Sequence, residues 1–120
     1  MVSFTLNRDN FRLKRATDTV REAVAKAMYR RASLVMADSQ EHYVPVDTGY
    51  LRSTGFVNQP VIVDGTVEVT LGYSALYAEV VHEDLTAVHP NGQAKFLARP
   101  LNAAKKGFAG EMAEAARAAQ

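Results

Sequence analysis

The hydrophobic positions within residues 17–43 recur at spacings of three and four residues. Val20 and Val24 begin this pattern, and neither glycine nor proline interrupts the segment. The periodicity predicts one long amphipathic helix, with Thr17 or Asp18 as its N-cap. At a rise of 1.5 Å per residue the helix would be roughly 40 Å long. A helix of that length in so small a chain is expected to expose part of its surface to neighbours.

A second pattern, with a period of two, predicts β-structure. Residues 56–63 and 66–71 are separated by Asp64-Gly65, a dipeptide typical of two-residue hairpin turns. Apolar and polar residues alternate along the second strand, which indicates a sheet with one buried face. Pro60 cannot donate to a strand ladder, so its strand is expected to lie at an edge or to be bulged. Residues 2–6 also alternate and favour a further short strand.

The remaining segments predict less regular structure and a last helix. Residues 73–82 could form a helical turn followed by a strand that carries Val80 and Val81. From Phe96 a final helix is expected to continue through Met112, without a strong buried stripe. Together these elements predict an α+β fold, in which a long N-terminal helix packs on a small, mainly antiparallel sheet and a C-terminal helix follows.

Length and composition limit the classes of protein to consider. The chain has 120 residues, which suits one domain spanning residues 1–120. It has no cysteine, which excludes disulfides, thiolate nucleophiles and cysteine-based zinc sites. No apolar run approaches the ~18 residues of a membrane span, and the N-terminus lacks a signal-peptide pattern. We therefore expect no membrane association, and synthesis and retention in a cytoplasm.

The small net charge of +1 hides two halves of opposite sign. Residues 1–31 hold eight basic and three acidic residues, which gives +5, and the remainder holds six basic and ten acidic residues, which gives −4. Opposed halves suit subunits that pack head to tail, and a solvated basic helix face is the plainer explanation. The basic face could also contact DNA phosphates without sequence preference. The candidate residues for such a contact, or for docking, are Arg12, Lys14, Arg15, Arg21, Lys26, Arg30 and Arg31.

The end of the long helix is marked by Pro-Val-Asp-Thr-Gly-Tyr-Leu-Arg at residues 45–52. Pro45 is expected to end the helix near Tyr43, because proline has no N–H and restricts the residue before it. Asp47 can accept hydrogen bonds from the following amides, and glycine at position 49 allows a backbone conformation that a Cβ would penalise. The Asp-Thr-Gly sequence also occurs in aspartic proteases, but there it lies between β-strands. We therefore interpret it here as a structural turn.

These residues, followed in order by Tyr-Ala at 77–78, Val-His-Glu-Asp at 81–84 and Lys-Phe-Leu at 95–97 with Pro-Leu at 100–101, resemble a known family. The chain is similar to the small tail-completion, or head-tail joining, proteins of long-tailed double-stranded DNA phages, often described as minor capsid or neck proteins. The resemblance covers roughly residues 17–110. It departs from the family's commoner form at Val80, where an aromatic residue is expected.

The resemblance implies a structural virion protein without enzymatic activity or a cofactor. It would form a homo-oligomeric ring, a hexamer or dodecamer, in the phage neck, after assembly in the host cytoplasm. Its implied partners are a portal-side connector, adaptor or head-closure protein on one side and a tail terminator or tail tube protein on the other. Two alternatives remain open: a tail terminator protein, and a small DNA-binding regulatory protein based on the basic helix.

The candidate structural or interface residues follow from the matched segments. They are Asp47, Thr48, Gly49, Leu51, Arg52, Tyr77, His82, Glu83, Asp84, Lys95, Phe96 and Leu97. His82 and Glu83 are expected to end a strand and to contact Arg52 or a neighbouring subunit. An alternative is that His82, Glu83 and Asp84 bind a metal together with His89, although these residues lie at the start of an expected loop.

Overall fold

The longest element of the computed structural model is a helix that crosses the whole sheet. The structure describes residues 1–8, 17–45, 49–63, 66–85 and 92–119. Helix α1 (Asp18–Asp38) begins at Thr17, whose side chain accepts a hydrogen bond from the amide of Val20 at 3.3 Å. It continues directly into one π-helical turn, η2 (Ser39–Tyr43). The expected helix over residues 17–43, its N-cap and its end near Tyr43 are therefore confirmed.

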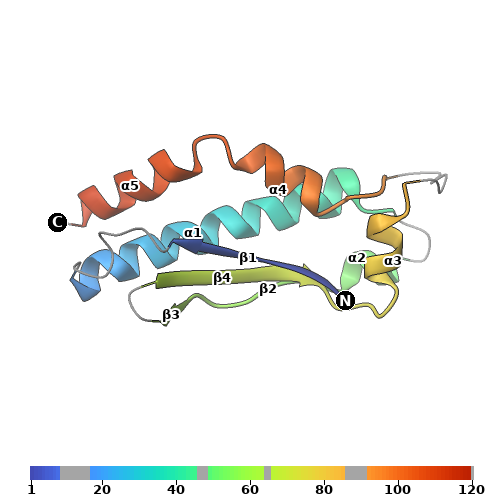
Figure 1. Ribbon diagram of the computed structural model, residues 1–120, viewed down its shortest axis with the longest axis horizontal. Coiled ribbons are helices and arrows are strands. Elements are labelled where there is room, and N and C mark those ends of the chain that lie inside the picture. Colours follow the sequence, from blue (N-terminus) through green and yellow to red (C-terminus); the bar gives the residue numbers. More distant parts are fainter. Residues whose placement is uncertain (9–16, 46–48, 64–65, 86–91, 120) are drawn as a thin grey trace.

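A four-stranded antiparallel sheet packs against α1. Its strands are β1 (Val2–Arg8), β2 (Gly55–Val57), β3 (Val61–Val63) and β4 (Thr66–Tyr73). Strand β4 is central, with β1 on one side and both β2 and β3 on the other (Figure 1). The buried side chains of β4 are Val67, Val69, Leu71 and Tyr73, which confirms that one face of the sheet is buried.

The strand that contains Pro60 behaves as its sequence predicts. Phe56 pairs with Gly72, but Val61 pairs with Glu68, so one extra residue lies between the two pairings. Strands β2 and β3 are thus two parts of one interrupted edge strand, with Pro60 at the interruption. Val63 pairs with Thr66 across the two-residue connection, which confirms the hairpin, although residues 64–65 themselves lie outside the described residues.

The C-terminal region forms two helices, α4 (Ala98–Ala104) and α5 (Phe108–Ala118), so the expected single helix is wrong. Gly107 separates them with a φ of +83°, a conformation that has little cost only for glycine. The expectation that this region lacks a buried stripe is also wrong, because Met112 is fully buried and Phe108 packs against the core beside it. Helix α1 lies between the sheet and these two helices (Figure 1).

Two short helices lie side by side at one end of the 48 Å long molecule: α2 (Tyr50–Ser53) and α3 (Ala78–Glu83) (Figure 1). The expected strand through Val80 and Val81 is wrong, because both residues are in α3. The overall α+β class, with a long helix on a small antiparallel sheet and a C-terminal helix, is confirmed.

Candidate assembly surface

Three of the matched sequence segments meet at the end of the molecule that carries α2 and α3. Thr54, which follows α2, accepts a hydrogen bond from the amide of Ser74 at its carbonyl, at 3.1 Å, and one from the amide of Ala75 at its hydroxyl, at 3.2 Å. These bonds hold the segment before α3 against the end of α2. The rings of Tyr50 and Tyr77 then lie 6.2 Å apart, centre to centre. Residues from two distant motifs are thereby placed next to each other.

The π-helical turn supplies a buried serine to this region. The amide of Val44 donates to the carbonyl of Ser39 at 2.8 Å, which is the i to i+5 bond of a π-turn. The Ser39 hydroxyl donates to the carbonyl of Phe96 at 2.7 Å and lies 2.7 Å from the hydroxyl of Tyr73. A serine has one hydroxyl proton, so Tyr73 must donate to Ser39. The buried polar atoms of α1's end, β4 and the 95–97 segment therefore satisfy one another.

Tyr73 is fully buried, and its ring continues this contact into the core. Burial raises the pKa of Tyr73 to about 12, although the hydrogen bond with Ser39 acts in the opposite direction. The ring of Phe96 meets it edge-on, with centroids 5.1 Å apart. Phe96 also meets the ring of His82 edge-on at 4.9 Å. A continuous row of rings thus joins β4 to α3 through the 95–97 segment.

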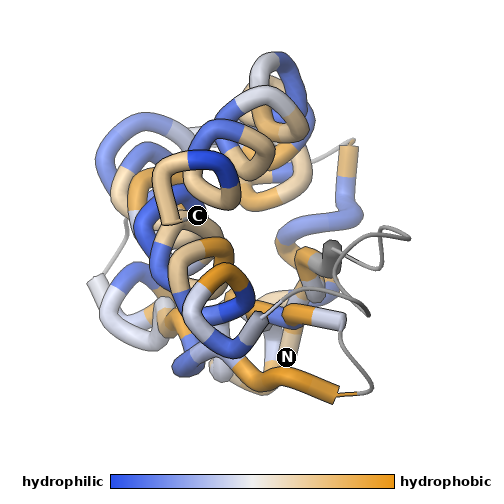
Figure 2. Tube along the Cα trace, turned by 90° about the vertical axis from the view of Figure 1, so that its left-hand side faces the viewer, coloured by the Kyte–Doolittle hydropathy of each residue, from blue (hydrophilic) through white to orange (hydrophobic). Residues whose placement is uncertain are grey.

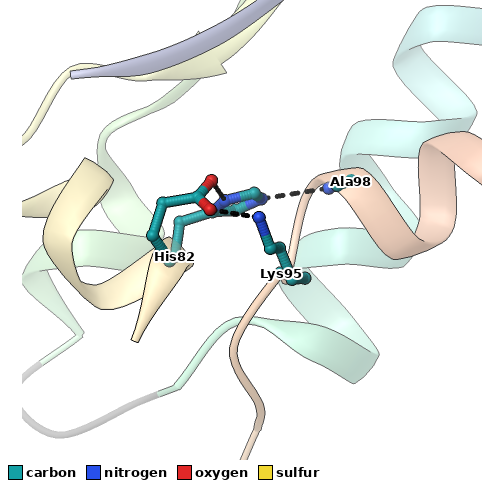
Figure 3. Close-up of polar contacts among 4 residues, drawn as sticks. His82, Lys95 and Ala98 are labelled. Carbon is teal, nitrogen blue, oxygen red and sulfur yellow. Dashed lines mark hydrogen bonds and ion pairs between the residues drawn. The ribbon is translucent and has the colours of Figure 1, made fainter. Parts of the chain in front are cut away.

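His82 is the second buried polar residue of this region, and both of its ring nitrogens have partners (Figure 3). Nε2 accepts a hydrogen bond from the amide of Ala98 at 3.1 Å, and Nδ1 lies 2.9 Å from a carboxylate oxygen of Glu83. Because a backbone N–H can only donate, Nε2 carries no proton, and Nδ1 must donate to Glu83. The amide of Ala98 belongs to the first residue of α4, so His82 caps that helix from α3.

The surroundings keep His82 neutral. Burial lowers the pKa of His82, and its contact with Glu83 opposes this effect only in part. The Lys95 ammonium contacts the other carboxylate oxygen of Glu83, and this bond lowers the pKa of the Glu83 carboxyl (Figure 3). The amide of Lys95 also donates to the carbonyl of His82 at 2.6 Å. Two sequence segments that are separated by about ten residues therefore form one polar clamp: His82, Glu83, Lys95 and the amide of Ala98.

The outer side of the same region is apolar and exposed. We call this the α3 surface; its residues are Tyr50, Leu76, Tyr77, Val80 and Leu85. Leu76 is 93% exposed and Val80 is 69% exposed. Single exposed apolar residues are ordinary on protein surfaces, but a group at the junction of two short helices indicates a contact surface.

The first matched motif is only partly described. Asp47 and Thr48 lie outside the described residues, so the expected Asp47 turn is not tested. Gly49 precedes α2 with a φ of +86°, as expected for a position that a Cβ would penalise. Leu51 is buried in the core, whereas the side chain of Arg52 is exposed and its carbonyl accepts from the side-chain amide of Gln40.

The second matched region differs from its prediction. His82 and Glu83 end a helix rather than a strand, and the side chain that they contact is Lys95 instead of Arg52. Asp84 follows α3 and is exposed. Phe96 and Leu97, the other candidates of this region, are both fully buried. The candidate residues thus divide into a buried group that holds the region together and an exposed group on its outside.

The candidate basic residues that the structure describes do not form one free face. Arg12, Lys14 and Arg15 lie outside the described residues. Arg21 pairs with Asp18 at 3.0 Å, and Arg31 lies 3.3 Å from Glu111 of α5 and donates to the carbonyl of Lys106. Lys26 and Arg30 are exposed on α1.

The metal alternative finds no support in the clamp. Both ring nitrogens of His82 are occupied by other partners, and His89 lies outside the described residues. Within the described ranges, no group of three His, Cys, Asp or Glu residues is placed to hold a metal ion.

Sequence reasoning missed the residues that connect these segments. Ser39 and Tyr73 form a buried polar pair 34 positions apart, and no local pattern shows such a pair. The exposure of Leu76 and Val80 was missed as well, because residues 73–82 show neither an alternating nor a helical pattern of apolar positions.

No protein family model, curated protein or solved structure matches this chain. In the described part of the chain, none of the helices combines the length and the hydropathy that crossing a bilayer requires.

Proposed function

We propose that this chain is a structural subunit of a phage neck, where it forms a ring that joins the head connector to the tail. The observation that carries the proposal is the meeting of the matched segments in space. Residues 49–52, 77–84 and 95–97 converge on one end of the molecule, where a buried polar clamp supports an exposed apolar surface. Motif residues of an enzyme would be expected to line a cleft, whereas these support a surface suited to a protein partner.

The buried members of the motifs have a clear role in such a subunit. A ring subunit makes repeated contacts, and each contact surface must keep its shape before assembly. Helix α3 has only six residues and has little stability on its own. Bonds from His82 to Ala98 and from Lys95 to the carbonyl of His82 hold α3 in place. The α3 surface is therefore preorganised by the same residues that carry the resemblance.

The pairing of basic residues on α1 favours this proposal over a DNA-binding regulator. Arg21 and Arg31 both engage acidic side chains within the subunit, and Arg31 holds α5 against α1. Among the described basic candidates Lys26 and Arg30 remain exposed, and two such side chains suit sequence-neutral contact with DNA phosphates in a channel.

A nonsense mutation in the gene for this chain, in the phage that encodes it, tests the proposal. Electron microscopy is expected to show DNA-filled heads and finished tails that remain unjoined. Adding the purified chain to that lysate should produce joined, infectious particles, and adding buffer or heat-unfolded chain should not. Tails of irregular length would instead identify a tail terminator, and normal particles with altered transcription would identify a regulatory protein.

A further inference from the structure

A second exposed apolar region lies at the other end of the molecule. Strand β3 is entirely apolar and exposed, and with the N-terminal half of α1 it borders a groove of about 350 Å³. We call this the α1–β3 groove; its lining includes Ala25, Lys26, Tyr29, Pro60 and Ile62. Figure 2, which views this end of the molecule, shows β3 as an uninterrupted hydrophobic stretch. An exposed apolar edge strand invites a partner unless something covers it.

The α3 surface has the shape that such a groove requires. Leu76 projects from a tight turn in which the amide of Ala78 donates to the carbonyl of Ala75 at 3.0 Å. Val80 follows one helical turn later, and Tyr77 is held beside the ring of Tyr50. Leu76 is thus a fixed apolar projection, and the volume of the groove is sufficient for one or two such side chains.

The charges beside the two regions are also complementary. Glu79 is exposed next to Val80 on α3, where Glu83 and Asp84 follow it. Lys26 is exposed at the groove and Arg30 follows one turn later on the same helix, while Glu22, one turn before Lys26, also lines the groove. Placing the acidic edge of the α3 surface at the Lys26 end of the groove pairs opposite charges, whereas contact between two α3 surfaces would bring like charges together.

We propose that the α3 surface of one copy occupies the α1–β3 groove of the next copy, with Leu76 and Val80 in the groove and Glu79 close to Lys26. This inference rests on the proposed ring and identifies the surfaces that close it. Both halves of the contact exist in one chain, at opposite ends of its 48 Å axis (Figure 1). Because the two surfaces differ, the contact is heterologous and propagates from copy to copy until a ring closes.

Disulfide trapping tests the contact directly, because the chain has no cysteine of its own. Gln59 is exposed at the groove, and Glu114 is exposed on α5 and serves as a control position. We would mix differently tagged L76C and Q59C chains under mild oxidation, and in parallel L76C and E114C chains. The L76C–Q59C product is expected to exceed the control by at least about tenfold, because bound surfaces raise the effective concentration of the two thiols. Equal yields, or a dominant L76C–L76C product, would overturn the inference.

A charge exchange provides a second, independent test. K26E and E79K are each expected to weaken self-association in analytical ultracentrifugation, and a chain that carries both changes should recover it. Failure of the double variant to recover would contradict the pairing. The two proposals can fail separately: trapping in purified necks at other positions but not at Leu76 rejects only the contact. Trapping at Leu76 in a chain that is absent from purified particles rejects only the neck function.

Discussion

The neutral state of the buried His82 predicts a specific dependence of stability on pH. Its ring accepts a bond from the amide of Ala98, and burial lowers its pKa in the folded chain. Histidine in the unfolded chain binds a proton near pH 6.5, so below that pH the unfolded state holds more protons at this position than the folded state. Stability is therefore fully present above pH 6.5 and falls as the pH drops through the window between the two pKa values. The slope approaches, and does not exceed, about 1.4 kcal/mol per pH unit.

Urea unfolding of the wild type and of His82→Gln between pH 7.5 and 5.5 measures this effect. The groups that face His82 are Glu83, Lys95 and Arg99, and the variant retains all three. The variant removes the imidazole and keeps these groups, so the difference between the two curves reports the contribution of His82. As the pH falls over this range, we expect the free energy of unfolding of the wild type to decrease by about 1 kcal/mol relative to that of the variant. A difference in unfolding free energy that does not change with pH would refute a neutral, buried His82. An NMR titration of the wild-type imidazole provides an independent measurement of its protonation.

Three further substitution experiments follow from the geometry. Ser39→Ala leaves two buried partners unpaired and should lower the free energy of unfolding by about 2–4 kcal/mol. Tyr73→Phe removes only one bond and should lower it by about 1 kcal/mol. Similar urea midpoints for the two variants would contradict the network. Gly49→Ala should destabilise by about 1 kcal/mol because φ is +86°, while Gly110→Ala, in a helix with equal free space, should stabilise by up to about 1 kcal/mol; thermal melts that move in the same direction would contradict this. Met112→Ala should cost about 2–5 kcal/mol if α5 belongs to the subunit core, and a change below about 0.5 kcal/mol in urea unfolding would mean that α5 does not contribute.

The parts of the fold that the sequence predicts correctly are those determined by residues close together in the chain. The long helix begins at Thr17 and ends before Pro45, as capping and proline geometry require. The hairpin and its interruption at Pro60 follow from a turn dipeptide, an alternating strand and a missing N–H. Each of these signals acts over a few residues, so no tertiary contact is needed to interpret it.

The wrong predictions concern segments whose secondary structure depends on a tertiary contact or on a backbone torsion. Val80 and Val81 favour a strand by propensity, but they lie in α3, where the next residue, His82, accepts a hydrogen bond from the amide of Ala98. Gly107 lies within the single helix expected from Phe96 through Met112, whereas its positive φ ends one helix and begins another. The π-turn at Ser39 likewise accompanies bonds to partners 34 and 57 positions away. None of these partners is recognisable from residue spacing.

The motif residues lie close together in the structure, but the sequence did not predict which of them are buried. Sequence placed His82, Glu83 and Lys95 in one group because they share a resemblance, and the structure brings them into contact. It could not show that His82 is buried and Leu76 exposed, because a short helix at the end of a sheet has no periodic pattern to reveal which side faces the core.

Substitutions on the two sides of α3 are therefore expected to affect the subunit differently. On the inner side, His82 bonds to the first amide of α4, so changes there alter the stability of the fold and the position of α3 together. On the outer side, Val80 and the neighbouring Leu76 are exposed. Truncating these side chains should change the stability of the folded subunit little, and under the proposed function it should weaken the binding of a partner. A partner surface can be recognised by this separation, because its residues matter for assembly while leaving the isolated chain unchanged. The sequence motif includes the inner residue His82, whereas the proposed contact would depend on the exposed Leu76 and Val80 beside it.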